Sequence, residues 1–190
     1  MGIDLKKANL QSVKIIASVI AFLWIIHFFS TIIPFIKTWG IYPREITGLL
    51  GIITSPLIHL NLSHIISNTT ALIFLGFVFI ILEQGRAAYI FIAIYFFSGL
   101  GTWLIGSGGK SHIGASGVIY GLMGYLLTIG IFRKHVLTII LSLFIFIFYG
   151  ATLFGMLPFF TSSRVSWQAH LAGFIVGVIV AQTEAKINKN

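Results

Sequence analysis

Long apolar runs, separated by charged residues or by Gly and Pro, make up most of this sequence. Each run is close to the ~20 residues that a helix needs to cross a hydrocarbon core of ~30 Å. The runs lack the strict alternation of apolar and polar positions that a barrel strand requires, so each is predicted to be a helix. The predicted spans are 13–34, 62–82, 87–105, 115–132, 136–157 and 167–183.

This pattern predicts an all-α membrane protein, a bundle of six transmembrane helices. The expected domain covers residues 13–183, between a short N-terminal tail at 1–12 and a short C-terminal tail at 184–190. Composition agrees, since 57% of the 190 residues are hydrophobic and 8% are charged, whereas about a quarter of a soluble domain is charged. With no Cys, the chain has no disulfide, thiolate metal site or cysteine nucleophile.

The distribution of Lys and Arg predicts the orientation, because cytoplasmic loops are enriched in both. With a cytoplasmic N-terminus, the inner side collects eight of them, Lys6, Lys7, Lys14, Arg86, Arg133, Lys134, Lys186 and Lys189, and the outer side four, Lys37, Arg44, Lys110 and Arg164. We therefore expect a multi-pass protein of the cell membrane with both termini in the cytoplasm. The same bias, with attraction to anionic lipid, explains the net charge of +8, so no nucleic-acid partner is predicted.

Three polar clusters interrupt the apolar spans. They are His64 with Asn68, the run Gly114–Gly117 that contains Ser116, and His170 followed by Gly173. Each lies in the first two turns of a span predicted to run inward. Counted from the nearest charge at the cytoplasmic end, Asn68, Ser116 and His170 lie at heights of ~22, ~26 and ~24 Å in a core of ~30 Å. The clusters are therefore predicted to share one plane near the outer face, where polar residues are candidates for function.

Simpler interpretations exist for each cluster taken alone. Small residues in membrane helices usually allow close packing, which we expect of Gly121, Gly124 and the Gly173-xxx-Gly177 pair. An ordinary interhelical hydrogen bond could satisfy His170, or the pair His64 and Asn68, which share a helix face. Their common depth favours a shared site instead. No His-Glu-x-x-His pair is present, and the acidic residues lie away from this plane, so neither metal nor cofactor is predicted; those residues are Asp4, Glu45, Glu83 and Glu184.

The motifs carry a family resemblance. Gly-x-Ser-Gly at Ser116, Ala-His-x-x-Gly-x-x-x-Gly at His170 and His-x-x-x-Asn at His64 resemble the rhomboid family of intramembrane serine proteases, in order and topology, over residues 52–181. The resemblance implies the minimal six-span, bacterial-type core. The family often has a Trp-Arg pair in its first outer loop, but Trp39 and Arg44 are separated here, so no role is transferred to them.

The resemblance also implies roles for residues. Ser116 would be the nucleophile and His170 the general base and then acid, as a dyad without a carboxylate. Asn68, His64 and the backbone N–H of Ser116 would form the oxyanion hole. Tyr120 matches the family aromatic that stacks on the base, although an ordinary core aromatic would have the same spacing. The remaining supporting residues are two glycines, Gly114 and Gly117. They would let the backbone and the substrate approach closely around the serine.

The implied function is serine endopeptidase activity on transmembrane segments of membrane-protein substrates that enter laterally from the bilayer. The polar outer half of the second span predicts a water-filled cavity for hydrolysis. The gate would be the fifth span or the loop after it, 158–160. Two alternatives stay open: a catalytically inactive rhomboid-like protein that binds membrane-protein clients, and a small transporter or channel. The second is disfavoured, because the inner halves of the spans are almost entirely apolar.

Overall fold

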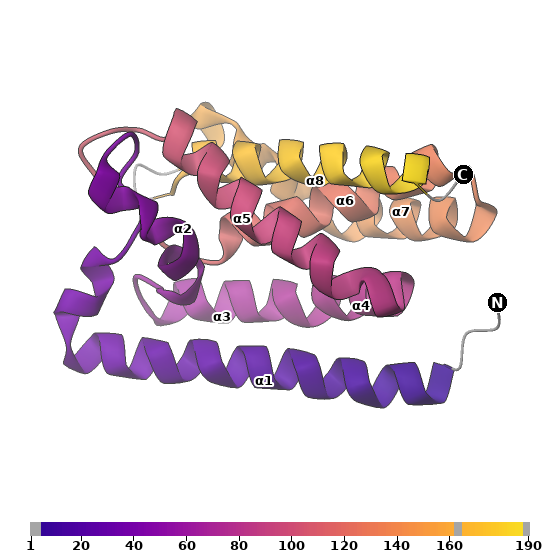
Figure 1. The fold of residues 1–190 in the computed structure, drawn as a ribbon, viewed down its shortest axis with the longest axis horizontal. Coiled ribbons are helices and arrows are strands. Elements are labelled where there is room, and N and C mark those ends of the chain that lie inside the picture. Colours follow the sequence, from indigo (N-terminus) through magenta and orange to yellow (C-terminus); the bar gives the residue numbers. More distant parts are fainter. Residues whose placement is uncertain (1–4, 162–164, 188–190) are drawn as a thin grey trace.

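The computed structural model describes residues 5–161 and 165–187, and helices make up nearly all of it (Figure 1). The α-helices are α1 (Leu5–Ile32), α2 (Gly51–Thr54), α3 (Leu62–Ala71), α4 (Phe77–Glu83), α5 (Ala87–Ile105), α6 (Ser116–Arg133), α7 (Val136–Tyr149) and α8 (Trp167–Ile187). The π-helix η4 (Leu72–Gly76) joins α3 to α4. Short 3-10 helices complete the chain: η1 (Pro34–Thr38), η2 (Ile46–Leu49), η3 (Ser55–Leu57), η5 (Gln84–Arg86), η6 (Gly150–Met156) and η7 (Pro158–Phe160).

The prediction of an all-α membrane bundle is confirmed. Within the described residues, five helical segments are long and apolar enough to cross a membrane. One of them, Leu62–Ile105, has 44 residues. The chain reverses within it at η5, where Gln84 has a φ of 42°, so this segment contains both the second and the third predicted spans (Figure 1).

Three of the predicted spans differ from the helices that the structure describes. The first helix already begins at Leu5 and stops at Ile32, because Pro34 disfavours helical backbone at the residue before it. In the fifth predicted span, α7 ends at Tyr149, and the chain continues from Gly150 as the 3-10 helix η6, so that the apolar helical segment reaches Met156. The last helix extends beyond 183 to Ile187.

Some sequence predictions fall on residues that the structure does not describe. Arg164 and Lys189, used in the charge count, lie outside the described residues, as do residues 1–4 and 188–190 of the two expected tails. The connection at 35–60, between the first and second predicted spans, holds η1, η2, α2 and η3. It folds back against α5, where a methyl group at Gly99 would lie 2.9 Å from the Ile52 side chain.

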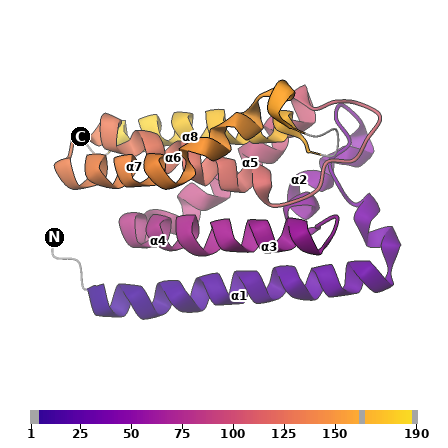
Figure 2. The ribbon, with the colours of Figure 1, turned by 180° about the vertical axis from the view of Figure 1, so that it is seen from behind.

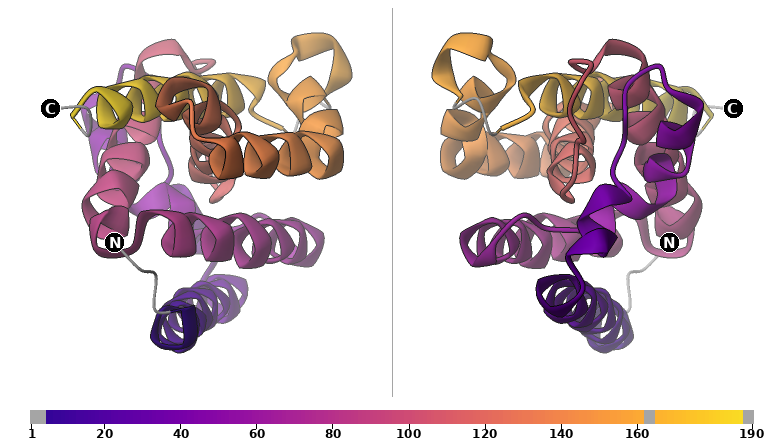
Figure 3. Two further views of the ribbon diagram at one scale, coloured as in Figure 1. Left: turned by 90° about the vertical axis from the view of Figure 1, so that its right-hand side faces the viewer. Right: turned by 90° about the vertical axis from the view of Figure 1, so that its left-hand side faces the viewer.

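Helix α6 occupies the centre of the bundle. In Figure 3 the ribbon forms layers, with α1 on one side, α3 and α4 next to it, and α6, α7 and α8 beyond them. In the most apolar 18-residue stretch of α6, 72% of the residues are buried, whereas in that of α1 only 17% are buried. A Cβ on Gly173 or Gly177 would collide with the carbonyl oxygens of Gly117 and Gly121. The predicted packing role of these glycines is therefore confirmed, and it holds α8 directly against α6.

The three helices that carry the polar clusters run in the same direction. Helices α3, α6 and α8 begin at one end of the molecule, whereas α1 begins and α8 ends at the other (Figures 1 and 2). His64, Ser116 and His170 all lie in the first turns of their helices. The tertiary structure thus places the three clusters at the same end of the bundle.

Acidic side chains meet at the opposite end. Glu83 is 2% exposed and accepts hydrogen bonds from Arg86 at 2.9 Å and Arg133 at 2.8 Å. Glu184 accepts from Tyr89 at 2.7 Å and forms an ion pair with Arg86 at 3.7 Å. Removing one partner of such a buried ion pair is strongly destabilising. The cluster ties α4, α5, α6 and α8 together, and it explains why the last helix continues past a charged residue.

Candidate active site

Ser116 is the first residue of α6 and follows a backbone segment that requires glycine. Gly114 has a φ of 119°, and its N–H donates to the Ser55 carbonyl at 2.9 Å. A methyl group at Gly114 would lie 2.5 Å from the His64 ring. A side chain here would therefore be strained by the backbone and blocked by the imidazole. This close approach brings His64, on α3, next to the turn that presents the serine.

Ser116 and His170 are within hydrogen-bond distance. His170 Nε2 lies 3.0 Å from Ser116 Oγ, and Nδ1 lies 2.9 Å from the Gly155 carbonyl oxygen. A carbonyl only accepts hydrogen bonds, so Nδ1 carries the proton and Nε2 accepts from the serine hydroxyl. His170 is 7% exposed. The His170 imidazole is thus in the tautomer that a general base for serine needs.

Tyr120 stacks on the His170 ring. The ring centroids are 4.1 Å apart and the planes differ by 8°. The hydroxyl donates to the Thr152 carbonyl oxygen at 2.5 Å, which satisfies the polar end of a buried aromatic. The structure therefore brings Tyr120 to the imidazole that the sequence motif predicted, and the stacking fixes the plane of the ring.

Two carbonyl oxygens of η6 complete this arrangement. Gly155 and Thr152 belong to the segment that follows α7, which the sequence suggested only as part of a gate. They contact His170 and Tyr120, respectively. Sequence reasoning missed both, because a backbone carbonyl has no residue-type signature. The segment after α7 therefore orients the base directly.

Asn68 offers an amide donor at the same end of the bundle. Its side chain on α3 is 4% exposed, and its Nδ2 has no hydrogen-bond partner among the described residues. An unpartnered buried donor costs free energy unless a ligand or water satisfies it. Helix α3 is fixed by its N-cap, where Asn61 Oδ1 accepts from the backbone N–H of His64 at 2.9 Å.

His59 and His112, which belong to none of the three motifs, support the site. His112 Nε2 donates to the Ser107 carbonyl at 2.9 Å, and Nδ1 lies 2.6 Å from Ser166 Oγ. Because Nε2 carries the proton, Nδ1 accepts from the Ser166 hydroxyl, whose oxygen accepts from the N–H of Ala169 at the start of α8. Burial lowers the pKa of His112, so the ring stays neutral. His112 thereby positions the first turn of the helix that carries His170.

The His59 ring is fully buried against the edge of His64, with ring centroids 5.1 Å apart. Burial lowers the pKa of His59 to about 4, and the neighbouring His64 adds to the shift. His59 is therefore neutral at physiological pH. Its contact restricts the position of His64, and a histidine five residues before His64 was the only sequence signal that could have indicated this.

Arg44, to which no role was assigned, anchors the first loop to the end of α5. Its Nη1 donates to the carbonyl oxygens of Leu104 and Gly106, each at 2.9 Å. Its backbone N–H donates to the Trp103 carbonyl at 3.1 Å. The loop is thus held at the end of the bundle where the polar clusters meet, without contributing a charged group to the dyad.

Comparisons with known proteins agree with this architecture. The Rhomboid domain model matches residues 47–186, a range that includes Ser116, His170 and Asn68. Over 148 residues the chain is 40% identical to uncharacterized proteins of Mycobacterium bovis and Mycobacterium tuberculosis, and 38% identical to one of Mycobacterium leprae. The match covers 75% of this chain and about three fifths (59–62%) of each relative. With a family match over most of its length, the chain belongs to the rhomboid family.

Proposed function

We propose that this chain is an intramembrane serine endopeptidase of the rhomboid type, with Ser116 as nucleophile and His170 as general base and acid. The observation that carries the proposal is the 3.0 Å contact from Ser116 Oγ to His170 Nε2, in the tautomer fixed by the Gly155 carbonyl. A serine hydroxyl needs an adjacent base to become a nucleophile. The family membership supports the same chemistry.

The reaction follows from this geometry. His170 Nε2 takes the hydroxyl proton while Ser116 Oγ bonds to the substrate carbonyl carbon, and a tetrahedral intermediate forms. The imidazolium then gives this proton to the leaving amine as the C–N bond breaks, which leaves an acyl-enzyme. Water attacks the ester, His170 accepts its proton, and the proton returns to Ser116 Oγ as the acid is released. The Gly155 carbonyl takes the orienting part that an Asp has in triads.

The oxyanion of that intermediate would be bound by donors from two helices. Asn68 Nδ2 is buried and has no partner among the described residues, and His64 lies beside the Gly114 turn. The Ser116 backbone N–H is at the N-terminus of the 18-residue helix α6, where the helix dipole favours negative charge. Preorganised donors of this kind stabilise the developing charge strongly when water is scarce.

Substrates would be transmembrane helices of other membrane proteins, entering laterally from the bilayer. The setting we propose is the cell membrane, with both termini cytoplasmic and the site near the outer face. Its support is that α6 and α8, which carry Ser116 and His170 in their first turns, begin at the end of the bundle opposite the start of α1 and the end of α8 (Figure 2), together with the excess of Lys and Arg expected on the cytoplasmic side. The 3-10 segment η6, which contacts His170, would have to move if this side opens to admit substrate.

A fluorophosphonate probe tests the proposal directly, because it reacts only with an activated serine. The purified chain in detergent should take up one probe, located on the peptide that contains Ser116. Ser116→Ala should abolish labelling, while Ser63→Ala, an exposed serine at the same end of the bundle, should label normally. A wild-type chain that neither labels nor cleaves a transmembrane model substrate would overturn the protease assignment and favour a catalytically inactive, client-binding rhomboid.

Asn68→Ala is expected to lower kcat for a transmembrane model substrate by about 10²–10³-fold, the usual loss for one oxyanion donor. KM should change little, because the lost interaction belongs to the transition state. Steady-state cleavage in proteoliposomes measures both constants. Ser67→Ala, one residue away and exposed, is the control and should keep wild-type kcat. Equal losses in both variants would contradict an oxyanion role for Asn68.

Gly155→Ala is expected to lower kcat by about 10²-fold, the loss associated with a misplaced catalytic group. The added methyl group would collide with the Tyr120 hydroxyl and lie 3.4 Å from His170 Nδ1, so the imidazole would shift away from Ser116. Rates of fluorophosphonate labelling measure this effect without a substrate. Gly150→Ala, in the same segment, meets Phe146 at an ordinary contact distance of 3.4 Å and should label at the wild-type rate.

A further inference from the structure

A chain of hydrogen bonds joins the loop after α5 to the start of α8, and His112 is its central member. Its Nε2–H donates to the Ser107 carbonyl oxygen at 2.9 Å, and its Nδ1 accepts from the Ser166 hydroxyl at 2.6 Å. Ser166 Oγ accepts in turn from the Ala169 N–H at 3.2 Å, a contact typical of a helix N-cap. His112 is buried. Both ring nitrogens therefore have a partner, and the carbonyl of Ser107 fixes which of them accepts.

The position of His112 is set by segments other than α8. Its backbone N–H and carbonyl oxygen pair with those of Ile41, in the first loop, at 2.9 Å each. A methyl group at Gly106 would lie 3.2 Å from His112 Nε2 and 2.6 Å from Pro43 Cγ, so little space surrounds the ring on this side. His112 is thus held by two loops, and it presents a fixed acceptor to Ser166.

The first turn of α8 carries the base. His170 lies four residues after Ser166, and its backbone N–H donates to the Ser166 carbonyl at 3.2 Å. In the same turn Gln168 Nε2 donates to the Ser107 hydroxyl at 2.5 Å. After this turn, the close approach of Gly173 to α6 holds the helix. The base therefore lies between two points at which α8 is held, the glycine contact and the N-cap bonded to His112.

We propose that His112 is a positioning residue for catalysis. By accepting the Ser166 hydroxyl it holds the first turn of α8, and with it His170, within hydrogen-bond distance of Ser116. This role rests on the proposed function. The N–H groups of a first turn have no intrahelical partner, so a cap that moves lets the turn move. His170 Nε2 lies 3.0 Å from Ser116 Oγ, and a displacement of about 1 Å can cost about 10²-fold in rate.

Two amide substitutions separate the acceptor of His112 from its donor. Asn carries its side-chain oxygen where Nδ1 lies, so His112→Asn keeps an acceptor for Ser166 and loses the donor to Ser107. Gln carries its amide nitrogen near the place of Nε2, so His112→Gln keeps that donor and loses the acceptor. His112→Phe loses both.

The acceptor is expected to decide the rate. His112→Gln and His112→Phe should lower kcat by up to about 10²-fold, with KM unchanged because His112 does not touch the substrate. His112→Asn should stay closer to the wild-type chain than to His112→Phe. Cleavage of a transmembrane model substrate in proteoliposomes measures both constants, and the rate of fluorophosphonate labelling of Ser116 reports the effect without a substrate.

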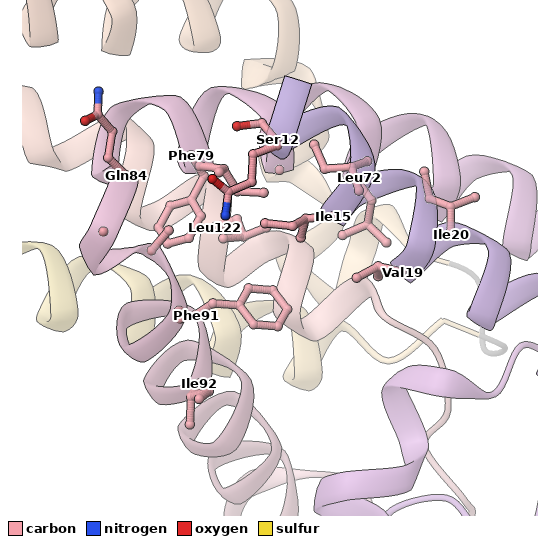
Figure 4. A pocket seen from close by; sticks show the side chains of 17 residues that line it. Ser12, Ile15, Val19, Ile20, Leu72, Phe79, Gln84, Phe91, Ile92 and Leu122 are labelled. Carbon is pink, nitrogen blue, oxygen red and sulfur yellow. The ribbon is translucent and has the colours of Figure 1, made fainter. Parts of the chain in front are cut away.

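A purely structural role for His112 would make each rate follow thermal stability instead. Phe79→Leu is the control for this alternative, because Phe79 is 1% exposed and lines an apolar cavity of about 790 Å³ between α1, α4 and α5, away from the dyad (Figure 4). Its loss of packing should lower the unfolding temperature. Measured below that temperature, Phe79→Leu should label at the wild-type rate.

The outcomes separate this role from the proposed function. A wild-type chain that does not label would overturn both. With a wild-type chain that labels, equal rates in His112→Asn and His112→Gln, a wild-type rate in His112→Phe, or the same loss in Phe79→Leu would overturn the role of His112 alone. If His112→Phe does not fold, the two amide variants decide. Nitrogen NMR of the chain with isotope-labelled histidine should find the His112 proton on Nε2, and a proton on Nδ1 instead would also overturn the role.

Discussion

Replacing His170 with alanine is expected to lower cleavage of a transmembrane substrate by about 10⁴–10⁶-fold, because Ser116 loses the base that removes its proton. The base lies 3.0 Å from the hydroxyl and is oriented by two contacts, the Gly155 carbonyl at 2.9 Å and the Tyr120 ring at 4.1 Å. Cleavage of a model substrate in proteoliposomes measures the loss. Fluorophosphonate labelling of Ser116 should fall with it.

The control for this variant is His135→Ala, which removes an exposed histidine just before α7 and should leave cleavage unchanged. The double variant Ser116→Ala, His170→Ala gives a sharper test. Groups that act as one unit show strongly non-additive losses, so the double variant should be no slower than Ser116→Ala alone. Additive losses would contradict a dyad, since they would mean that the two side chains contribute independently.

Gly177→Leu is expected to destabilise the folded chain by about 3 kcal/mol or more, the range of severe overpacking. A Cβ at this position would collide with the Gly121 carbonyl oxygen and lie 2.7 Å from the Tyr125 backbone nitrogen. Both obstacles are backbone atoms of α6, so only a separation of the two helices can relieve the overlap. Thermal unfolding in detergent, followed by circular dichroism, measures the shift.

The same substitution at Gly85 is the matched control. A Cβ there would meet nothing within 4 Å, so Gly85→Leu should unfold near the wild-type temperature. Because α6 carries Ser116 and α8 carries His170, Gly177→Leu should also lose probe labelling in whatever fraction stays folded. Wild-type stability of Gly177→Leu would contradict the close α6–α8 contact, whereas normal labelling would show that the dyad does not depend on it.

Helix boundaries show where sequence reasoning stops being sufficient. Hydropathy locates a span by its apolar stretch, and a charge normally ends the stretch. Helix α8 instead continues through Glu184. Inside the bundle the carboxylate of Glu184 forms an ion pair with Arg86 and accepts a hydrogen bond from Tyr89. These partners lie in η5 and the first turn of α5, almost one hundred residues earlier in the chain. The end of a helix thus depends on contacts between distant segments, which a local pattern does not contain.

The apolar runs and the three motifs were enough to predict the helical bundle, the common direction of α3, α6 and α8, and the candidate site residues Ser116, His170, Asn68, His64 and Tyr120. The bilayer makes this possible. A backbone segment that crosses lipid in a chain of this pattern must be helical, and a polar side chain in lipid is costly, so its presence indicates function. The tertiary structure alone decided the tautomer of His170, through the Gly155 carbonyl. It also decided the support from His112 and the cavity beside α1. Every residue has a backbone carbonyl oxygen, and a cavity depends on how helices pack together. Neither feature can therefore be recognised from residue types.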